Sequence, residues 1–201
     1  MIVSRRLLLT ATALAALPGL RATAADAADP RMADRTLGHD DAPVTMQEWF
    51  SMTCTHCAAW SKDVFPEVKA KLIDTGKLRY IYRDFPLDQV ALTASMVARA
   101  LPAARYEPFV ASLLASQDRW AFARDANSTD ELFKRAALAG MPRAIFDATI
   151  ADTGLRTAVL TEQQRGVDLY KVDSTPTFVI NEKPHSGEQS YSAIARFVAA
   201  G

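Results

Sequence analysis

Cys54 and Cys57 constrain this chain more than any other feature. They are the only cysteines among its 201 residues, and two residues separate them. The apolar run 44–50 leads into the pair, and a pattern typical of an amphipathic helix follows it. A C-x-x-C motif between a strand and a helix is the usual position of a redox-active dithiol. Redox chemistry is therefore the leading hypothesis, and a structural pair or half of a metal site are the alternatives.

The segments around the motif predict a βαβ unit. Val44–Phe50 alternates like a strand, and residues 77–85 have the aromatic-rich pattern of a second one. Between them, apolar residues recur every four positions from Trp60 to near Gly76, which predicts a helix that Pro66 should kink. A strand, a helix and a strand in this order favour parallel pairing with a right-handed crossover.

The rest of the chain predicts one domain with an inserted group of helices. Helical patterns fill residues 88–172, approximately, before a strand follows Pro176. So many helices between two strand regions predict an α-helical insertion that packs on the sheet as a subdomain. A hydrophobic content of 49% is ample for a core, so the fold does not need a disulfide between the cysteines for its stability. Residues 25–36 lack periodicity and predict a flexible lead to a domain over 37–201.

The N-terminal residues 1–24 have the pattern of a cleaved export signal. Arg5 and Arg6 form a basic region, and the apolar stretch 7–20 is too short for a stable membrane anchor. Ala22–Ala24 then offers the small residues that a signal peptidase reads. The arginine pair also fits the twin-arginine route, so that route and the general secretory route both stay open.

Charge argues against two classes of partner. The chain has 23 basic and 23 acidic residues, and removal of 1–24 takes away three arginines and no acids, which leaves a net charge of −3. No basic run longer than two residues remains, so binding to nucleic acid or to anionic lipid is not expected.

Because thiolates suit soft metals, a copper or zinc protein that uses both cysteines and a histidine is an alternative of another class. We expect no metal site.

The residues near the motif favour an activated thiol. A cysteine is a nucleophile only as a thiolate, and the N-terminus of a helix would stabilise that anion at Cys54. His56 can supply a positive charge or a hydrogen-bond donor to the same sulfur. Cys57, one turn further along the helix, is expected to be shielded and to resolve the mixed disulfide. Glu48 shares a strand face with apolar residues, so it is either a buried acid behind the dithiol or a glutamate on the sheet surface.

Three stretches together resemble the thioredoxin superfamily, and within it the DsbA-like thiol:disulfide oxidoreductases. They are Glu48–Cys57, Thr175–Val179 and Ala42–Val44. The resemblance extends from about Leu37 to the C-terminus. It implies an α/β architecture, namely a thioredoxin fold with an α-helical insertion.

The resemblance also implies a role for individual residues. Cys54 corresponds to the attacking cysteine, and Cys57 to the resolving one. Pro176 corresponds to a cis-proline that faces the dithiol and turns the backbone of Thr175 toward a substrate chain, which pairs with it as an added strand. Glu48 falls on the buried acid that helps a proton move at Cys57.

Thr55 departs from the best-known members, which have proline at this position, and we group it with the residues that contact substrate. Because the pair between the cysteines tunes the redox potential, this departure bears on how strongly the disulfide oxidises. The resemblance implies a periplasmic monomer that oxidises reduced exported proteins and is reoxidised by a quinone-linked membrane partner of the DsbB type. No cofactor is implied beyond the Cys54–Cys57 disulfide. A periplasmic reductase or isomerase, for example one that serves cytochrome c maturation, is the alternative within this chemistry.

Overall fold

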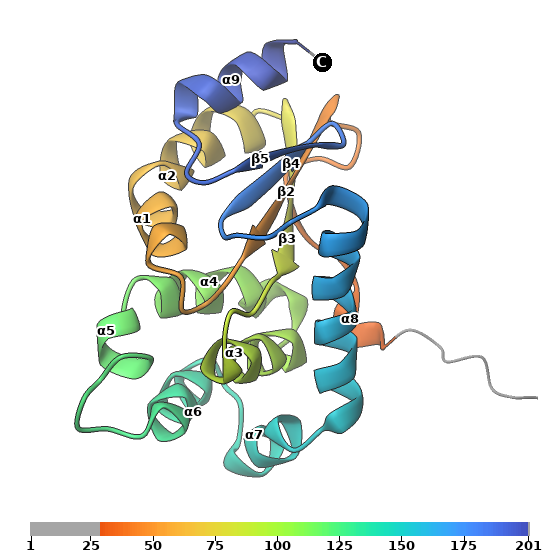
Figure 1. Ribbon diagram of the computed structural model, residues 1–201. Helices are drawn as coiled ribbons and strands as arrows, with labels where there is room; N and C mark the ends of the chain where they lie inside the picture. The colour runs from red at the N-terminus through yellow and green to blue at the C-terminus, as the bar shows by residue number, and fades with distance from the viewer. Residues whose placement is uncertain (1–28, 201) are drawn as a thin grey trace, which may run out of the picture.

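The structure, a computed structural model, describes residues 29–200, and within this range a five-stranded mixed sheet lies at the centre of the molecule (Figure 1). The strands follow the order β1-β3-β2-β4-β5. Strands β2 and β3 are parallel, and the other neighbouring pairs are antiparallel. The strand bounds are Arg35–Leu37 (β1), Val44–Phe50 (β2), Leu78–Asp84 (β3), Thr177–Ile180 (β4) and Lys183–Ser186 (β5).

The parallel pair confirms the predicted βαβ unit. Its register places Val44 opposite Leu78 and Phe50 opposite Asp84. Strand β2 lies between β3 and β4, so both of its edges are paired, and nearly all of its side chains are buried. The strand that leads to the dithiol is therefore an interior strand of the sheet with almost no exposed side chains.

The helix after the dithiol is interrupted, as the position of Pro66 predicts. Helix α1 spans Thr55–Asp63, α2 spans Phe65–Val68, and a π-helix, η2, spans Lys69–Ile73. Pro66 lies in the first turn of α2, where its missing N–H group costs no intrahelical hydrogen bond. The dithiol therefore sits on a short, separate helix of nine residues.

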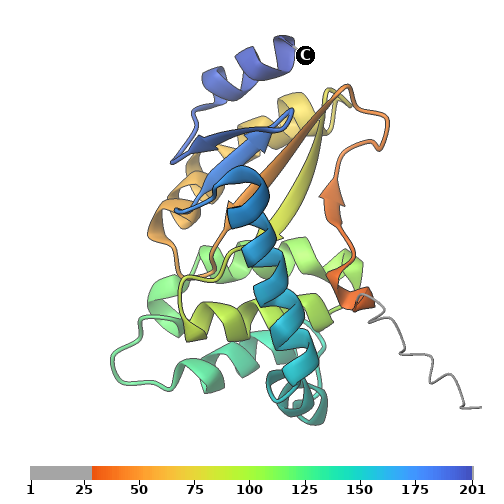
Figure 2. The same cartoon turned by 45° about the vertical axis from the view of Figure 1, so that its right-hand side comes forward.

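The predicted helical insertion is confirmed. Helices α3 to α7 gather beyond one end of the sheet, and α8 returns along a face of the sheet (Figure 2). The helix bounds are Gln89–Ala100 (α3), Ala103–Leu114 (α4), Gln117–Trp120 (α5), Ser128–Leu138 (α6), Arg143–Ile150 (α7) and Thr153–Tyr170 (α8).

Helix α8 packs directly on the central strand. Trp49 of β2 is 1% exposed, and a Cβ atom at Gly166 of α8 would lie 2.6 Å from its ring. Only glycine allows this approach, because real Cβ atoms do not come so close to another heavy atom. The insertion is therefore packed against the strand that positions the dithiol.

The N-terminal part of the domain differs from the expectation. A 3₁₀ helix, η1 (Pro30–Met32), precedes β1, and β1 pairs with the edge of β3. Arg31 binds Asp152 at 2.8 Å, which ties this segment to the start of α8. The flexible lead expected over 25–36 is therefore wrong from residue 29 onward, because a three-residue strand is too short to show periodicity. The export signal predicted for 1–24 lies outside the described residues.

A last helix, α9 (Tyr191–Ala199), closes the domain beside α2 (Figure 1). The side chain of Ser190 caps its N-terminus by accepting a hydrogen bond from the Ala193 amide at 3.2 Å. Across residues 29–200, no helix combines the length and apolar character needed to cross a membrane.

Candidate active site

Cys54 is the N-cap residue of α1, at the end of a tightly held loop. Its backbone is extended, with φ −76° and ψ 119°, and its N–H donates to the Ser51 carbonyl at 3.2 Å. The Thr53 hydroxyl donates to the Asp88 carboxylate at 2.7 Å. Asp88 in turn caps α3 by accepting a hydrogen bond from the Ala91 amide. The dithiol loop is thus fixed to the first helix of the insertion.

Several donors converge on the sulfur of Cys54. The Cys57 thiol makes the largest contribution, followed by Thr175 and by the backbone N–H groups of Cys57 and His56. The Cys57 N–H lies 3.3 Å from the sulfur. Although burial acts in the opposite direction, these donors lower the pKa of Cys54 from 9.0 to about 5. Cys54 is therefore a thiolate at neutral pH, as its position at a helix N-terminus predicts.

Cys57 has the opposite environment. It is fully buried, and burial, with the hydrogen bond to Cys54, raises the pKa of its thiol far above the ordinary range. Both cysteines are free in this structure, so the dithiol is in its reduced form. At neutral pH the reduced pair holds one thiolate, at Cys54, and one thiol, at Cys57.

Glu48 is a buried acid, and the buried interpretation of this residue is confirmed. Its side chain is 3% exposed and accepts a hydrogen bond from the Tyr80 hydroxyl. Burial raises the pKa of Glu48 to about 8, the Tyr80 hydrogen bond opposes that rise, and the Cys54 charge adds to it. Its other carboxyl oxygen is buried and has no hydrogen-bond partner within residues 29–200. Glu48 therefore holds a proton at neutral pH.

Thr175 and Pro176 lie against the dithiol, and the peptide bond between them is cis, as the resemblance implies. The Cys54 sulfur lies 3.3 Å from the Thr175 carbonyl oxygen, to which it donates a hydrogen bond only when it is protonated. The Thr175 hydroxyl is buried and makes no full hydrogen bond in the described part of the chain. Its proximity to the sulfur nevertheless lowers the pKa of Cys54. The Pro176 carbonyl accepts a hydrogen bond from the Gly187 amide at 2.8 Å, which ties this loop to the end of β5.

His56 differs from the expectation. Its ring is 73% exposed and bonds to the Glu188 carboxylate at 2.8 Å, rather than to the sulfur of Cys54. The Glu188 hydrogen bond and charge raise the pKa of His56, so the imidazolium is favoured. What His56 donates to the sulfur is its backbone N–H. Thr55 begins α1 and is exposed, in keeping with contact to a substrate.

Sequence analysis missed a residue of the insertion that contacts this loop. The Gln117 side chain, on α5, donates to the carbonyl oxygens of Met52 and Cys54, each at 2.9 Å. It also missed Glu188 and Tyr80. Glu188 and Gln117 lie more than 60 residues from the partners they contact, and no local pattern marks them.

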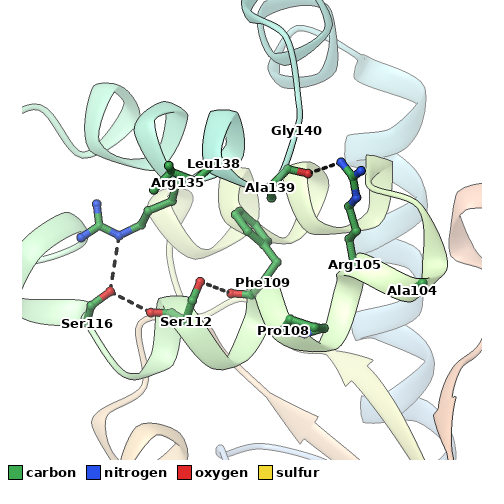
Figure 3. A pocket seen from close by; sticks show the side chains of 10 residues that line it. All are labelled: Ala104, Arg105, Pro108, Phe109, Ser112, Ser116, Arg135, Leu138, Ala139 and Gly140. Atoms are coloured by element: carbon green, nitrogen blue, oxygen red, sulfur yellow. Dashed lines mark hydrogen bonds between the residues drawn. The ribbon is translucent and has the colours of Figure 1, made fainter.

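A groove in the helical insertion lies away from the dithiol. The groove, of about 630 Å³, opens between α4 and α6, and Figure 3 shows Arg105 and Arg135 at its two ends with Phe109 between them. None of the residues that line it is a predicted site residue. Within residues 29–200, no three His, Cys, Asp or Glu side chains gather as a metal site would require.

Comparison with known proteins places the chain in a family. A family model described as Thioredoxin matches residues 31–200. A Rickettsia felis protein named "Putative protein-disulfide oxidoreductase" is 30% identical over 150 residues, which is 74% of this chain and 53% of that protein. A Rickettsia prowazekii protein of similar name is also 30% identical over 150 residues and is 54% covered. The chain thus spans about half the length of the curated relatives it matches.

Solved structures share this architecture. The crystal structure of Wolbachia pipientis alpha-DsbA1 is 29% identical, has a TM-score of 0.76, and covers 84% of this chain and 90% of its own. BdbD from Bacillus subtilis, in its oxidised form, is 18% identical with a TM-score of 0.72, over 83% of this chain and 91% of its own, and shows the fold alone. These likenesses confirm the predicted α/β thioredoxin fold with a helical insertion.

Proposed function

The chain belongs to the thioredoxin superfamily as a DsbA-like member, and on that premise we propose that it is a thiol:disulfide oxidoreductase that donates the Cys54–Cys57 disulfide to substrate proteins. The observation that carries the proposal is the contrast between the two sulfurs. Cys54 has a pKa of about 5, whereas Cys57 is buried and protonated. A stabilised thiolate stabilises the reduced protein and makes its disulfide an oxidant, so the contrast favours donation over reduction.

The proposed reaction has two exchange steps. A substrate thiolate attacks the sulfur of Cys54, the Cys54–Cys57 bond breaks, and Cys57 leaves and takes up a proton. A second substrate thiolate attacks the substrate sulfur of the mixed disulfide, and Cys54 leaves as a thiolate. The substrate loses two electrons to the dithiol and gains a disulfide. The low pKa of Cys54 makes it a good leaving group in the second step.

Two other residues support these steps. Glu48 has a pKa of about 8 and holds a proton at neutral pH, so we assign it as the proton source when Cys57 leaves. The Thr175 backbone lies against the Cys54 sulfur, so we assign it to pairing with the substrate chain. The Cys54–Cys57 disulfide itself accepts the two electrons from the substrate, and the proposal includes no cofactor.

The compartment and partners are part of the proposal. The basic and apolar pattern of residues 1–24 supports export, and an exported dithiol meets oxidising conditions in the periplasm. Reduced exported proteins are the proposed substrates of a monomeric enzyme. Reoxidation by a quinone-linked membrane protein of the DsbB type would return the disulfide for another cycle.

The test is the equilibrium between the Cys54–Cys57 couple and glutathione. We expect the protein to be fully reduced by millimolar glutathione and to oxidise a reduced, unfolded substrate such as ribonuclease A. A potential near the value of about −270 mV typical of thioredoxin would overturn the oxidase direction and favour the reductase alternative. Absence of any exchange with glutathione would overturn the activity as a whole.

A further inference from the structure

Gln117 connects the helical insertion to the backbone of the attacking cysteine. Its side-chain amide donates one hydrogen bond to the Met52 carbonyl and one to the Cys54 carbonyl, both at 2.9 Å. Gln117 is 7% exposed, and Met52 is fully buried, so the Met52 carbonyl depends on a donor from the protein. The two bonds reach carbonyls on either side of Thr53, in the loop that delivers Cys54 to the helix.

The geometry requires a hydrogen-bond donor at position 117. Both partners are carbonyl oxygens, which only accept, so the NH₂ group of the side chain must face them. A carboxylate at this position would face two acceptors without a donor. The chemistry of the site therefore distinguishes glutamine from glutamate, which has nearly the same shape.

The short helix that carries Gln117 is anchored to the rest of the insertion. Gln117 is the first residue of α5, and Trp120 at the end of that helix is fully buried. The Trp120 indole donates to the Leu113 carbonyl of α4 at 2.8 Å. The amide of Gln117 is therefore presented by an anchored turn of the insertion.

The Cys54 carbonyl is a part of the helix cap. It also accepts the Ala58 amide at 3.1 Å, which is the first hydrogen bond of α1. The orientation of the Cys54 peptide determines whether its sulfur meets the N–H groups of His56 and Cys57. A donor that holds this carbonyl from outside the helix also holds the sulfur in line with those groups.

We propose that Gln117 is a positioning residue through which the helical insertion keeps Cys54 in the cap geometry that favours its thiolate. The proposal rests on the proposed exchange function and deepens it. Gln117 touches neither sulfur, so it acts only through the backbone of the dithiol loop. The insertion then contributes to the reactivity of the dithiol as well as to the outer shape of the protein.

The test compares Gln117→Met with the wild type. Methionine keeps the length and approximate volume of the side chain and removes both donors. We expect the thiolate of Cys54, followed by its absorbance at 240 nm during acid titration, to titrate at a higher pH. The equilibrium constant for oxidising glutathione should fall about three- to tenfold, which corresponds to the net free energy that one hydrogen bond typically contributes.

Gln163→Met is the matched control. Gln163, on α8, also donates its amide to a loop carbonyl, that of Pro86, at 3.2 Å, but it does not contact the dithiol loop. Its replacement should leave the titration of Cys54 and the glutathione equilibrium at wild-type values. Thermal melts of both variants report any common loss of stability.

Two outcomes would overturn the proposal: wild-type values for Gln117→Met, or an equal shift in Gln163→Met. If Gln117→Met does not fold, Gln117→Ala decides the question by the same titration, because it also removes both donors. The thiolate titration needs no partner, so it tests Gln117 even if the wild type fails to exchange disulfides. Failure of the proposed function and failure of this inference are therefore distinguishable.

Discussion

Cys54 and Cys57 lie three residues apart at the start of one helix, yet their surroundings have opposite chemistry. Cys54 is the cap residue, and hydrogen-bond donors from two segments of the chain, residues 56–57 and Thr175, face its sulfur. Cys57 lies one turn further in, where the acid Glu48 and the apolar core surround it. The same side chain therefore becomes an anion at one position and a neutral thiol at the other. Hydrogen-bond donors therefore outweigh burial in determining the pKa of Cys54, whereas burial determines the pKa of Cys57.

The largest effects on disulfide exchange should come from removing either sulfur. Cys54→Ser should lower disulfide transfer to a reduced peptide by about a thousandfold or more, because the exchanging sulfur is gone. Cys57→Ser should instead accumulate mixed disulfides at Cys54, since the resolving thiol is missing. Mass spectrometry after acid quenching in oxidised glutathione distinguishes the two results. Adducts that form at Cys57 in the Cys54→Ser variant would reverse the assignment.

The thiolate of Cys54 should make the stability of the reduced protein depend on pH. A group with a lowered pKa contributes fully above its unfolded value, near 9.0, and loses its contribution as the pH falls through its folded value, about 5. Urea unfolding should therefore show the reduced wild type losing stability relative to Cys54→Ala between pH 7 and pH 5. The loss in the relative folding equilibrium constant should be about tenfold per pH unit at most. A difference that stays constant over this range contradicts a thiolate at neutral pH.

Glu48→Gln should affect the Cys57 side alone. Removal of the proton source should slow the step in which Cys57 leaves by about tenfold or more, with little change in the pKa of Cys54. Because the folded pKa of Glu48 is raised from 4.5 to about 8, the wild type loses stability as the pH rises through this window, and the glutamine variant does not. The stability gain of the variant should therefore grow from pH 5 to pH 8. Equal rates for variant and wild type in acid-quenched exchange would remove Glu48 from the mechanism.

His56→Ala should have the smallest effect, and only on the Cys54 side. The ring is mostly exposed and bonds to Glu188, so its charge is screened and partly neutralised. We expect the pKa of Cys54 to rise by less than about half a unit, equivalent to roughly threefold in the glutathione equilibrium. Glu188→Gln is the matched control, and it should shift the pKa of Cys54 by less than His56→Ala does. A tenfold change in His56→Ala would show that the ring leaves Glu188 for the sulfur.

Local patterns predicted the parts of this site that belong to one stretch of chain. The alternation of Val44–Phe50 and the helical repeat after Cys57 placed the dithiol between a strand and a helix, and the structure agrees. Glu48 was recognised because its neighbours on one strand face are apolar. The cis bond before Pro176 was expected only from the resemblance, because an X-Pro pair by itself does not specify its isomer.

The residues that the sequence did not reveal are those whose partners are distant. Gln117 is one polar residue in a helical segment, and nothing nearby indicates that its amide faces two carbonyls more than 60 residues away. Glu188 lies 132 residues from His56 and takes the ring that was expected to face the sulfur. Strand β1 has only three residues, which is too few for a period-two pattern to be recognised.

The sequence by itself determined that two cysteines stand at the start of a helix, in a βαβ unit with a helical insertion. Spacing and periodicity are local properties, and they are enough to establish that arrangement. Only the tertiary structure decided how far the pKa values of the two sulfurs diverge, since desolvation and hydrogen bonding depend on what the fold packs around each atom. Thr175 and Gln117 reach Cys54, and Glu48 reaches Cys57, through packing that brings distant segments together.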